Sequence, residues 1–316
     1  MYFVSDRYKV LDMNEKIVFG KFYKARDLQE DNIVLIQIIR DNKHIRDNFL
    51  PNFIDESTML VEINSPHIAK ILDVGMHTVN NKECFYIVNE YFCGIELSKV
   101  IRGNYMDLNS IVNITRTILK TLGETHIHDL YHGALNESNI FVDEYYNIKI
   151  YDFCITKANK GINIRKDGDI TFLSPHQLNI NYTDKESDFF TLGIILFDAI
   201  FKKMPFGDAK TESEMLKLID KGIDWNSAAI NDENAALVNM VKKLIRRKEK
   251  YESASDALVD LSKFMYAKAD IIDEVDNIIT YNKVNENNTK SKNEFLKKAV
   301  LLVLAMSTLA TVIAQF

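Results

Sequence analysis

Over the first ninety residues, apolar positions alternate with polar ones or form short β-branched runs, as in strands that pack on one face. The segments with this pattern are 8–10, 17–26, 33–40, 68–74 and 84–90. One stretch differs, because its apolar residues recur at helical spacing, at Ile54, Met59, Leu60 and Ile63. This part of the chain is therefore predicted to be β-rich, with one helix over 53–63.

The pattern changes after Gly94, where long helical periodicity takes over. The segments with it are 109–130, 188–201, 212–221 and 235–246. Strands followed by helices, with a break near residue 93, predict an α+β chain of two lobes. We place the β-rich lobe at 1–93 and the helical lobe at 94–268.

The C-terminal end has a different character from either lobe. Residues 269–298 are predicted to be a polar linker, since the stretch 282–293 has one apolar residue in twelve. Residues 299–316 follow with no charge in eighteen positions, enough for a helix of about 27 Å. Three lysines precede this run, at 292, 297 and 298. They predict a single-pass membrane anchor with the lobes on the cytoplasmic side; the alternative is a buried or surface helix.

Composition excludes several classes of protein. The chain has 39 Lys and Arg against 45 Asp and Glu, a net charge of −6, so no basic excess is available to neutralise nucleic-acid phosphates. Its three cysteines share no CxxC spacing, which argues against a disulfide framework or a zinc ribbon. The first nine residues lack the apolar core of a signal peptide. We therefore expect the chain to fold in a reducing cytosol.

Several ungapped segments carry a family resemblance, over about Tyr8 to Phe264. They read YKARD at 23–27, YIVNEYFCG at 86–94, NIFV at 139–142, IKIYDF at 148–153, FLSPHQ at 172–177 and SDFFTLGIILFDAIFKKMPF at 187–206. In their order and spacing the chain resembles a eukaryotic-type (Hanks-type) serine/threonine protein kinase of the kind that bacteria use. The resemblance implies a bilobal protein-kinase-like fold and, in an ordinary member, transfer of the ATP γ-phosphate to protein.

The nucleotide-binding parts implied by the resemblance are poorly kept. Of the glycine-rich turn only Gly20 matches, and Glu15 stands where the first glycine would be. Gln37 replaces the third-strand lysine and brings no charge to the phosphates, while Leu35 replaces the small residue that borders adenine. The helix glutamate that would pair with that lysine corresponds to Glu56, expected here to be solvated or locally paired. The positions that the resemblance assigns to nucleotide binding are Gly20, Gln37, Glu56 and Glu90.

The catalytic loop lacks its two reactive groups. Ala134 stands at the position of the aspartate that accepts the substrate proton, and Asn136 at that of the phosphate-stabilising lysine. Glu137 as a substitute base is disfavoured, because it lies three residues further on and is expected to face elsewhere. Asn139 and Asp152 keep the residue types that bind magnesium in the family. For Asp152, a structural role on the activation segment is an equal alternative.

Other positions correspond to residues that stabilise the fold of a kinase rather than take part in catalysis. The residues at the positions of the hydrophobic spine, Leu60, Ile71, His132 and Phe153, are all compatible with packing, and Asp188 is the residue that anchors the catalytic loop in the family. Cys154 replaces a glycine after Phe153. A structural ion pair is missing at both ends, at His176 and Lys250. A compensating lysine from the second strand, Lys21 or Lys24, is disfavoured by position and by the alternation of side chains.

These observations favour a membrane-tethered pseudokinase, a scaffold or regulator of signalling without a cofactor. The alternatives are a divergent active kinase that uses Mg-ATP, and a nucleotide sensor without turnover. The expected partner is a protein, either an active kinase or a membrane complex, with no nucleic acid.

Overall fold

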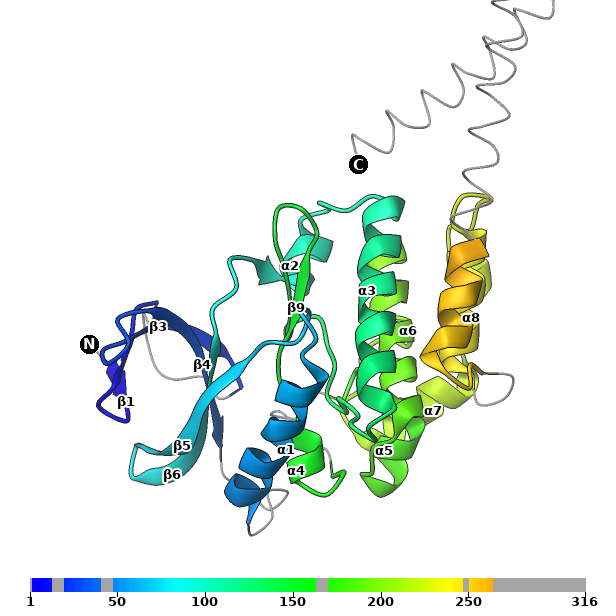
Figure 1. Cartoon of the computed structure of the whole chain (residues 1–316). Helices are drawn as coiled ribbons and strands as arrows, with labels where there is room; N and C mark the ends of the chain where they lie inside the picture. The colour runs from blue at the N-terminus through cyan, green and yellow to red at the C-terminus, as the bar shows by residue number, and fades with distance from the viewer. Residues whose placement is uncertain (1, 13–19, 41–47, 163–169, 247–249, 264–316) are drawn as a thin grey trace, which may run out of the picture.

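The computed structural model describes residues 2–12, 20–40, 48–162, 170–246 and 250–263. Its larger sheet is antiparallel, with six strands in the order β1-β2-β3-β4-β6-β5. These strands are β1 (Tyr2–Val4), β2 (Tyr8–Val10), β3 (Phe22–Asp27), β4 (Ile33–Arg40), β5 (Ile71–Val79) and β6 (Lys82–Glu90). In Figure 1 this sheet lies on the left and the helical part of the molecule on the right.

Side-chain alternation along β4 divides the sheet into two faces. Val34, Ile36 and Ile38 pack in one apolar cluster with residues of β2, β3 and β6. The alternate residues point to the other face of the sheet. Of these, Leu35 belongs to a small separate cluster and Ile39 to the main apolar core. Gln37 has the same parity as Leu35 and is fully buried. The period of two therefore turns Gln37 and Leu35 toward the space between the lobes.

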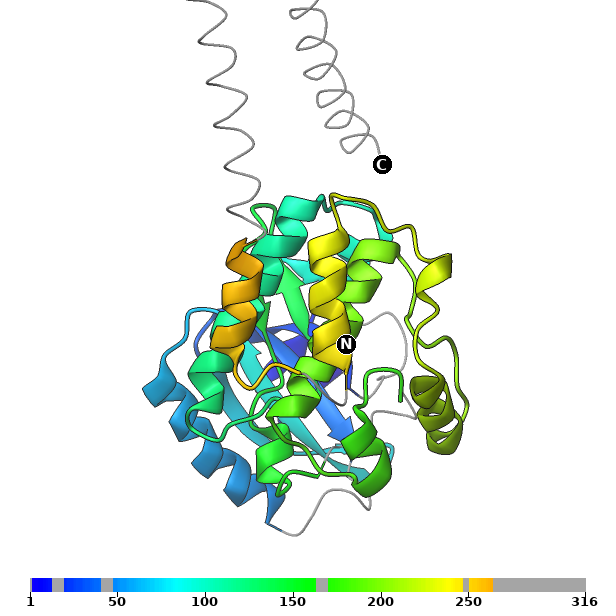
Figure 2. The ribbon, with the colours of Figure 1, turned by 90° about the vertical axis from the view of Figure 1, so that its right-hand side faces the viewer.

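One helix, α1 (Phe49–Ile63), lies in the first lobe, between β4 and β5 in the chain. The helices of the second lobe are α2 (Leu97–Arg102), α3 (Leu108–His126), α4 (Ile155–Ala158), α5 (Pro175–Ile180), α6 (Lys185–Phe201), α7 (Glu212–Lys221) and α8 (Ala235–Ile245), with a 3₁₀ turn at Trp225–Ser227. The central helix α6 begins at a capping box, in which the Asp184 side chain accepts from the Ser187 N–H. Figure 1 shows α6 between α3 and α8, and α6 contacts both of these helices. In Figure 2 the yellow α8 lies in front of α6.

A small three-stranded sheet, β7-β8-β9, brings distant chemistry together. Its strands are β7 (Ile95–Glu96), β8 (Ile140–Val142) and β9 (Ile148–Ile150). In the β8–β9 hairpin, Ile140 is paired with Ile150. Asn139 precedes the first of these residues and Asp152 follows the second closely, so the hairpin register brings their side chains to the same end of the sheet.

The predicted bilobal α+β fold is confirmed, with differences at the ends of elements. Helix α1 begins at Phe49, four residues before the predicted start, and α3 ends at His126 rather than at residue 130. Strand β1 was not predicted, because three residues are too short for a periodic signal. The predicted linker (269–298) and anchor (299–316) lie outside the described residues. Within the residues described, no helix has both the length and the apolar character needed to cross a bilayer.

Candidate functional site

One buried carboxylate binds the backbone of the loop that follows α3. Asp188, on α6, accepts hydrogen bonds from the backbone N–H of His132 (2.9 Å) and of Gly133 (2.7 Å). The His126 ring donates to the same carboxylate at 2.9 Å. Because hydrogen bonds to a charged acceptor contribute about 1.5–3 kcal/mol each, this arrangement holds the loop backbone firmly.

The side chains of this loop are occupied with the loop itself. The Asn136 amide donates to the Ala134 carbonyl at 3.0 Å, and its oxygen accepts from the Ser138 N–H at 2.8 Å. Ala134 has only a methyl group where a proton acceptor would stand. Glu137 is buried, with a carboxylate oxygen 3.9 Å from the Arg102 guanidinium. The loop thus presents no base from either position.

Asn139 and Asp152 lie side by side, but not as a pair of metal ligands. The Asn139 oxygen accepts from the Asn136 N–H at 3.0 Å, and its amide nitrogen donates to the Ala134 carbonyl at 2.8 Å. A donor on one side and an acceptor on the other determine the amide orientation. The nitrogen therefore faces the Asp152 carboxylate, at 3.4 Å. An amide nitrogen has no lone pair for a metal ion, so Asn139 in this orientation offers no ligand on the side that faces Asp152.

Gln37 occupies the position of the phosphate-binding lysine. Its amide nitrogen donates to the Gly20 carbonyl at 3.0 Å and to the Asp152 carboxylate at 3.3 Å. These bonds connect β4, the turn before β3 and the segment after β9. An amide can bridge these groups, but it has no charge to neutralise a triphosphate.

Glu56, on α1, pairs with the segment after Asp152 and not with β4. Its carboxylate lies 3.5 Å from the Lys157 ammonium on α4. The Cys154 thiol donates to the Glu56 carbonyl at 3.3 Å, and burial raises the pKa of that thiol. Cys154 has φ +71°, a left-handed backbone that favours glycine. Helix α1 is therefore attached to α4.

The space next to Leu35 is filled by aromatic rings. Phe22, Leu35, Phe141 and Tyr151 form a buried cluster with Ala69, and Phe92 packs at its edge. We call these six residues the aromatic plug. Its three central rings are in mutual contact, with centroid distances of 5.6 Å (Phe22–Phe141), 5.1 Å (Phe22–Tyr151) and 4.9 Å (Phe141–Tyr151).

Tyr151 connects the aromatic plug to the segment between the lobes. Its side chain is almost completely buried, and its hydroxyl donates to the Glu90 carbonyl at 3.2 Å. The Phe92 backbone hydrogen-bonds to the same phenol oxygen. Burial raises the pKa of Tyr151, so the phenol is neutral and able to donate. The backbone positions at 90 and 92 are therefore already bonded from within the protein.

The four spine positions come together in the main core. His132 and Phe153 are in ring contact at 4.6 Å between centroids, and the His132 ring donates to the Tyr151 carbonyl at 2.8 Å. Leu60 and Ile71 pack against the same core from α1 and β5. These contacts join the two lobes through apolar packing.

The remaining predicted positions have partners of their own. His176 bonds to the Asp184 carboxylate at 2.8 Å, and Lys250 forms an ion pair with Glu186. The Lys21 ammonium lies 5.6 Å from the centre of the Tyr23 ring. The Lys24 ammonium lies 4.5 Å from the centre of the Tyr91 ring, at the segment between the lobes.

Sequence reasoning missed two features of this site. The first is the aromatic plug beyond Leu35: Phe22, Phe141 and Tyr151 are ordinary strand residues by type, and only their alignment with the cleft could have signalled them. The second is Gly133, which has φ +72° and lies against Thr156 and Thr183. A Cβ there would come within 2.7 Å of both threonines, so this loop accepts only glycine without rearrangement.

Comparison with known proteins agrees with this architecture. A family model described as "Protein kinase domain" matches residues 18–270. The serine/threonine-protein kinase PrkC of Bacillus subtilis is 28% identical over 268 residues, which cover 82% of this chain and 40% of the relative. A probable serine/threonine-protein kinase of Clostridium acetobutylicum is 29% identical over 269 residues, which cover 82% of this chain and 40% of the relative. The chain thus spans about two fifths of the length of these relatives.

The family model covers most of the chain, and the matched region includes the helical lobe and the first lobe from β3 onward. The chain therefore belongs to the protein kinase domain family, and its relatives are serine/threonine kinases.

Proposed function

We propose that this protein is a pseudokinase, which binds partners through a kinase fold and does not transfer phosphate. Four features support the proposal: the methyl group of Ala134, the neutral amide of Gln37, the self-bonded Asn136 and the aromatic plug. Each affects a different requirement of phosphoryl transfer, namely proton acceptance, charge neutralisation, stabilisation of the phosphoryl group and room for the nucleotide.

The observation that carries the proposal is the hydrogen bond from Tyr151 to Glu90. In the family the position of Glu90 serves nucleotide binding, and here its carbonyl accepts from a buried phenol of the same chain. A nucleotide base would have to displace this phenol and the rings packed on it. Displacing such a buried aromatic side chain costs about 3–5 kcal/mol, judged by the removal of core aromatics.

One observation favours the alternative of a divergent active kinase. Asp152 and Asn139, the residue types that bind magnesium in the family, lie side by side, with 3.4 Å between Asn139 Nδ2 and Asp152 Oδ2. Such an enzyme would use Mg-ATP and an unconventional lysine.

Transfer of radiolabelled γ-phosphate from ATP to the chain itself and to a generic protein substrate separates the two functions. We expect no incorporation above that of the Asp152→Ala variant. Incorporation that depends on Asp152 would contradict the pseudokinase proposal and support the active kinase.

We also propose that the protein is tethered to a membrane by residues 299–316, with the kinase-like lobes in the cytoplasm. The support is the uncharged run of eighteen residues behind three lysines. Such a location would bring an active kinase or a membrane complex within reach as a partner.

Deletion of residues 299–316 tests this localisation. We expect the full chain in the membrane fraction and the shortened chain in the supernatant. Full-length protein that is already in the supernatant would contradict the anchor.

A further inference from the structure

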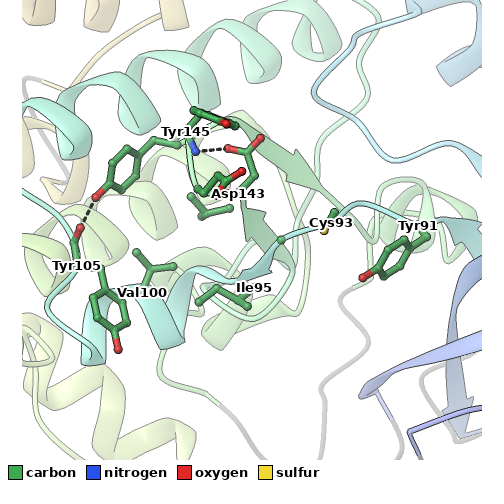
Figure 3. A pocket seen from close by; sticks show the side chains of 11 residues that line it. Tyr91, Cys93, Ile95, Val100, Tyr105, Asp143 and Tyr145 are labelled. Atoms are coloured by element: carbon green, nitrogen blue, oxygen red, sulfur yellow. Dashed lines mark hydrogen bonds between the residues drawn. The ribbon is translucent and has the colours of Figure 1, made fainter.

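A pocket of about 860 Å³ lies outside the cleft, on the far side of the segment that joins the lobes. It shares no lining residue with the aromatic plug. Its walls come from Tyr91 and residues 93–95, from Val100 of α2, from Tyr105 and from residues 142–146 at the turn between β8 and β9. Figure 3 shows Tyr91 and Tyr105 at opposite ends, with Ile95 and Val100 between them.

Tyrosines dominate this pocket and they are open to solvent. Tyr105 is 66% exposed and Tyr145 is 75% exposed, although both carry a large ring. Their positions are held by the backbone: the Tyr146 hydroxyl donates to the Tyr105 carbonyl, and the Asp143 carboxylate accepts from the Tyr145 N–H at 2.9 Å (Figure 3). Exposed aromatic residues are enriched where proteins bind other proteins.

Among the residues that the structure describes, the charged ones that line the pocket are both acidic. They are Asp143 and Glu144. The carboxylate of Asp143 is tied into the turn by the N–H groups of Tyr145 and Asn147, while Glu144 is exposed at the rim. Tyrosine faces add further negative potential, because the ring quadrupole attracts cations. The pocket is thus complementary to a positively charged group.

The chain itself offers one example of that contact. The Lys24 ammonium lies 4.5 Å from the centre of the Tyr91 ring and 3.4 Å from its hydroxyl, at one end of the pocket. A tyrosine of this pocket therefore already interacts with an ammonium group.

We propose that this pocket binds a lysine- or arginine-bearing segment of a partner protein. Small-molecule sites bury most of their ligand, whereas the tyrosines here form open walls that suit an extended peptide. The basic side chains would lie over the rings of Tyr105 and Tyr145, near the Glu144 carboxylate. The proposal rests on the scaffold function above and gives the chemistry of the partner.

A random library of peptides displayed on phage and selected on the full chain tests this site. We expect the selected peptides to be enriched in arginine and lysine. Measured by fluorescence anisotropy, their Kd should rise about fivefold in Tyr145→Ala and in Glu144→Gln, the effect of losing roughly 1 kcal/mol. Tyr182→Ala removes a half-exposed tyrosine outside the pocket and should leave the Kd unchanged.

Three results would overturn the proposal: no selected peptide, selected peptides without an excess of basic residues, or equal binding to all variants. Circular dichroism of each variant ensures that a loss of binding is not a loss of fold. No nucleotide enters this measurement. The peptide-binding proposal can therefore fail while the chain proves inactive with ATP. Peptide binding can also be found in a chain that proves to transfer phosphate, so the two proposals are tested separately.

Discussion

At the scale of single residues, three buried donors of the site are bonded within the chain. Gln37 donates to Asp152, Asn139 donates to the same carboxylate, and Tyr151 donates to the Glu90 carbonyl. These bonds help to stabilise polar side chains that lie buried between the lobes.

Replacement of Tyr151 by phenylalanine removes one hydroxyl and keeps the ring. We expect the free energy of unfolding to fall by about 1 kcal/mol, because the Glu90 carbonyl loses its donor. Urea unfolding measures this change. The matched control is Tyr145→Phe, an exposed tyrosine on the adjacent hairpin, which should change stability little. Equal effects of the two substitutions would mean that the Tyr151 hydroxyl is not bonded in solution.

The cysteines provide a second prediction at this scale. Burial raises the pKa of Cys154, so its reactive thiolate is scarce at neutral pH, while Cys93 is exposed. Iodoacetamide should therefore modify Cys93 of the native protein within minutes and leave Cys154 intact, as peptide mass spectrometry would show. Urea-unfolded protein, in which both thiols react, is the control. Rapid modification of native Cys154 would mean that the α1–α4 contact opens readily.

At the scale of elements, helices with long periodic patterns could be predicted from sequence, and the aromatic plug could not. The predicted helices at 188–201 and 212–221 coincide closely with α6 and α7. The aromatic plug takes its rings from β3, β8 and the segments after β6 and β9. Contacts between residues more than a hundred positions apart leave no periodic signal. Likewise, the amide orientation of Asn139 depends on backbone groups that only the folded loop presents.

One carboxylate, that of Asp260, links the last described helical residues, 254–263, to α8 through polar contacts. Asp260 accepts from the ammonium groups of Lys243 and Lys263 and from the Tyr251 hydroxyl, and these bonds, that of Lys243 first, lower its pKa to about 2. The unfolded pKa is about 3.9. The stabilisation is therefore complete above about pH 4 and is lost as the pH falls through 2.

Asp260→Asn tests this pH dependence. Because asparagine does not titrate, the variant should be less stable than the wild type at pH 7, and the difference should shrink between pH 4 and 2. Urea unfolding at several pH values measures the stability difference at pH 7 and its decrease at lower pH. Glu252→Gln, at an exposed acid just before the same helix, is the control. A difference that stays constant down to pH 2 would contradict the role of Asp260.

At the scale of the whole molecule, the lobes are joined by apolar packing. The main apolar core includes Ile39 and Phe85 of the sheet, Phe153 between the lobes and Leu192 of α6. The aromatic plug adds contacts between β3 and β4 of the sheet and Phe141 and Tyr151. We expect this packing to let the lobes keep one arrangement without a ligand, as the proposed scaffold function requires.

Thermal unfolding of the full chain with and without Mg-ATP tests the central claim most directly. A ligand at one hundred times its Kd adds about 2.7 kcal/mol to stability, which is readily measured as a rise in melting temperature. Our account predicts no rise at millimolar Mg-ATP beyond that produced by magnesium and an equal ionic strength of sodium sulfate. A saturable rise specific to ATP would contradict the claim that the aromatic plug closes the nucleotide site.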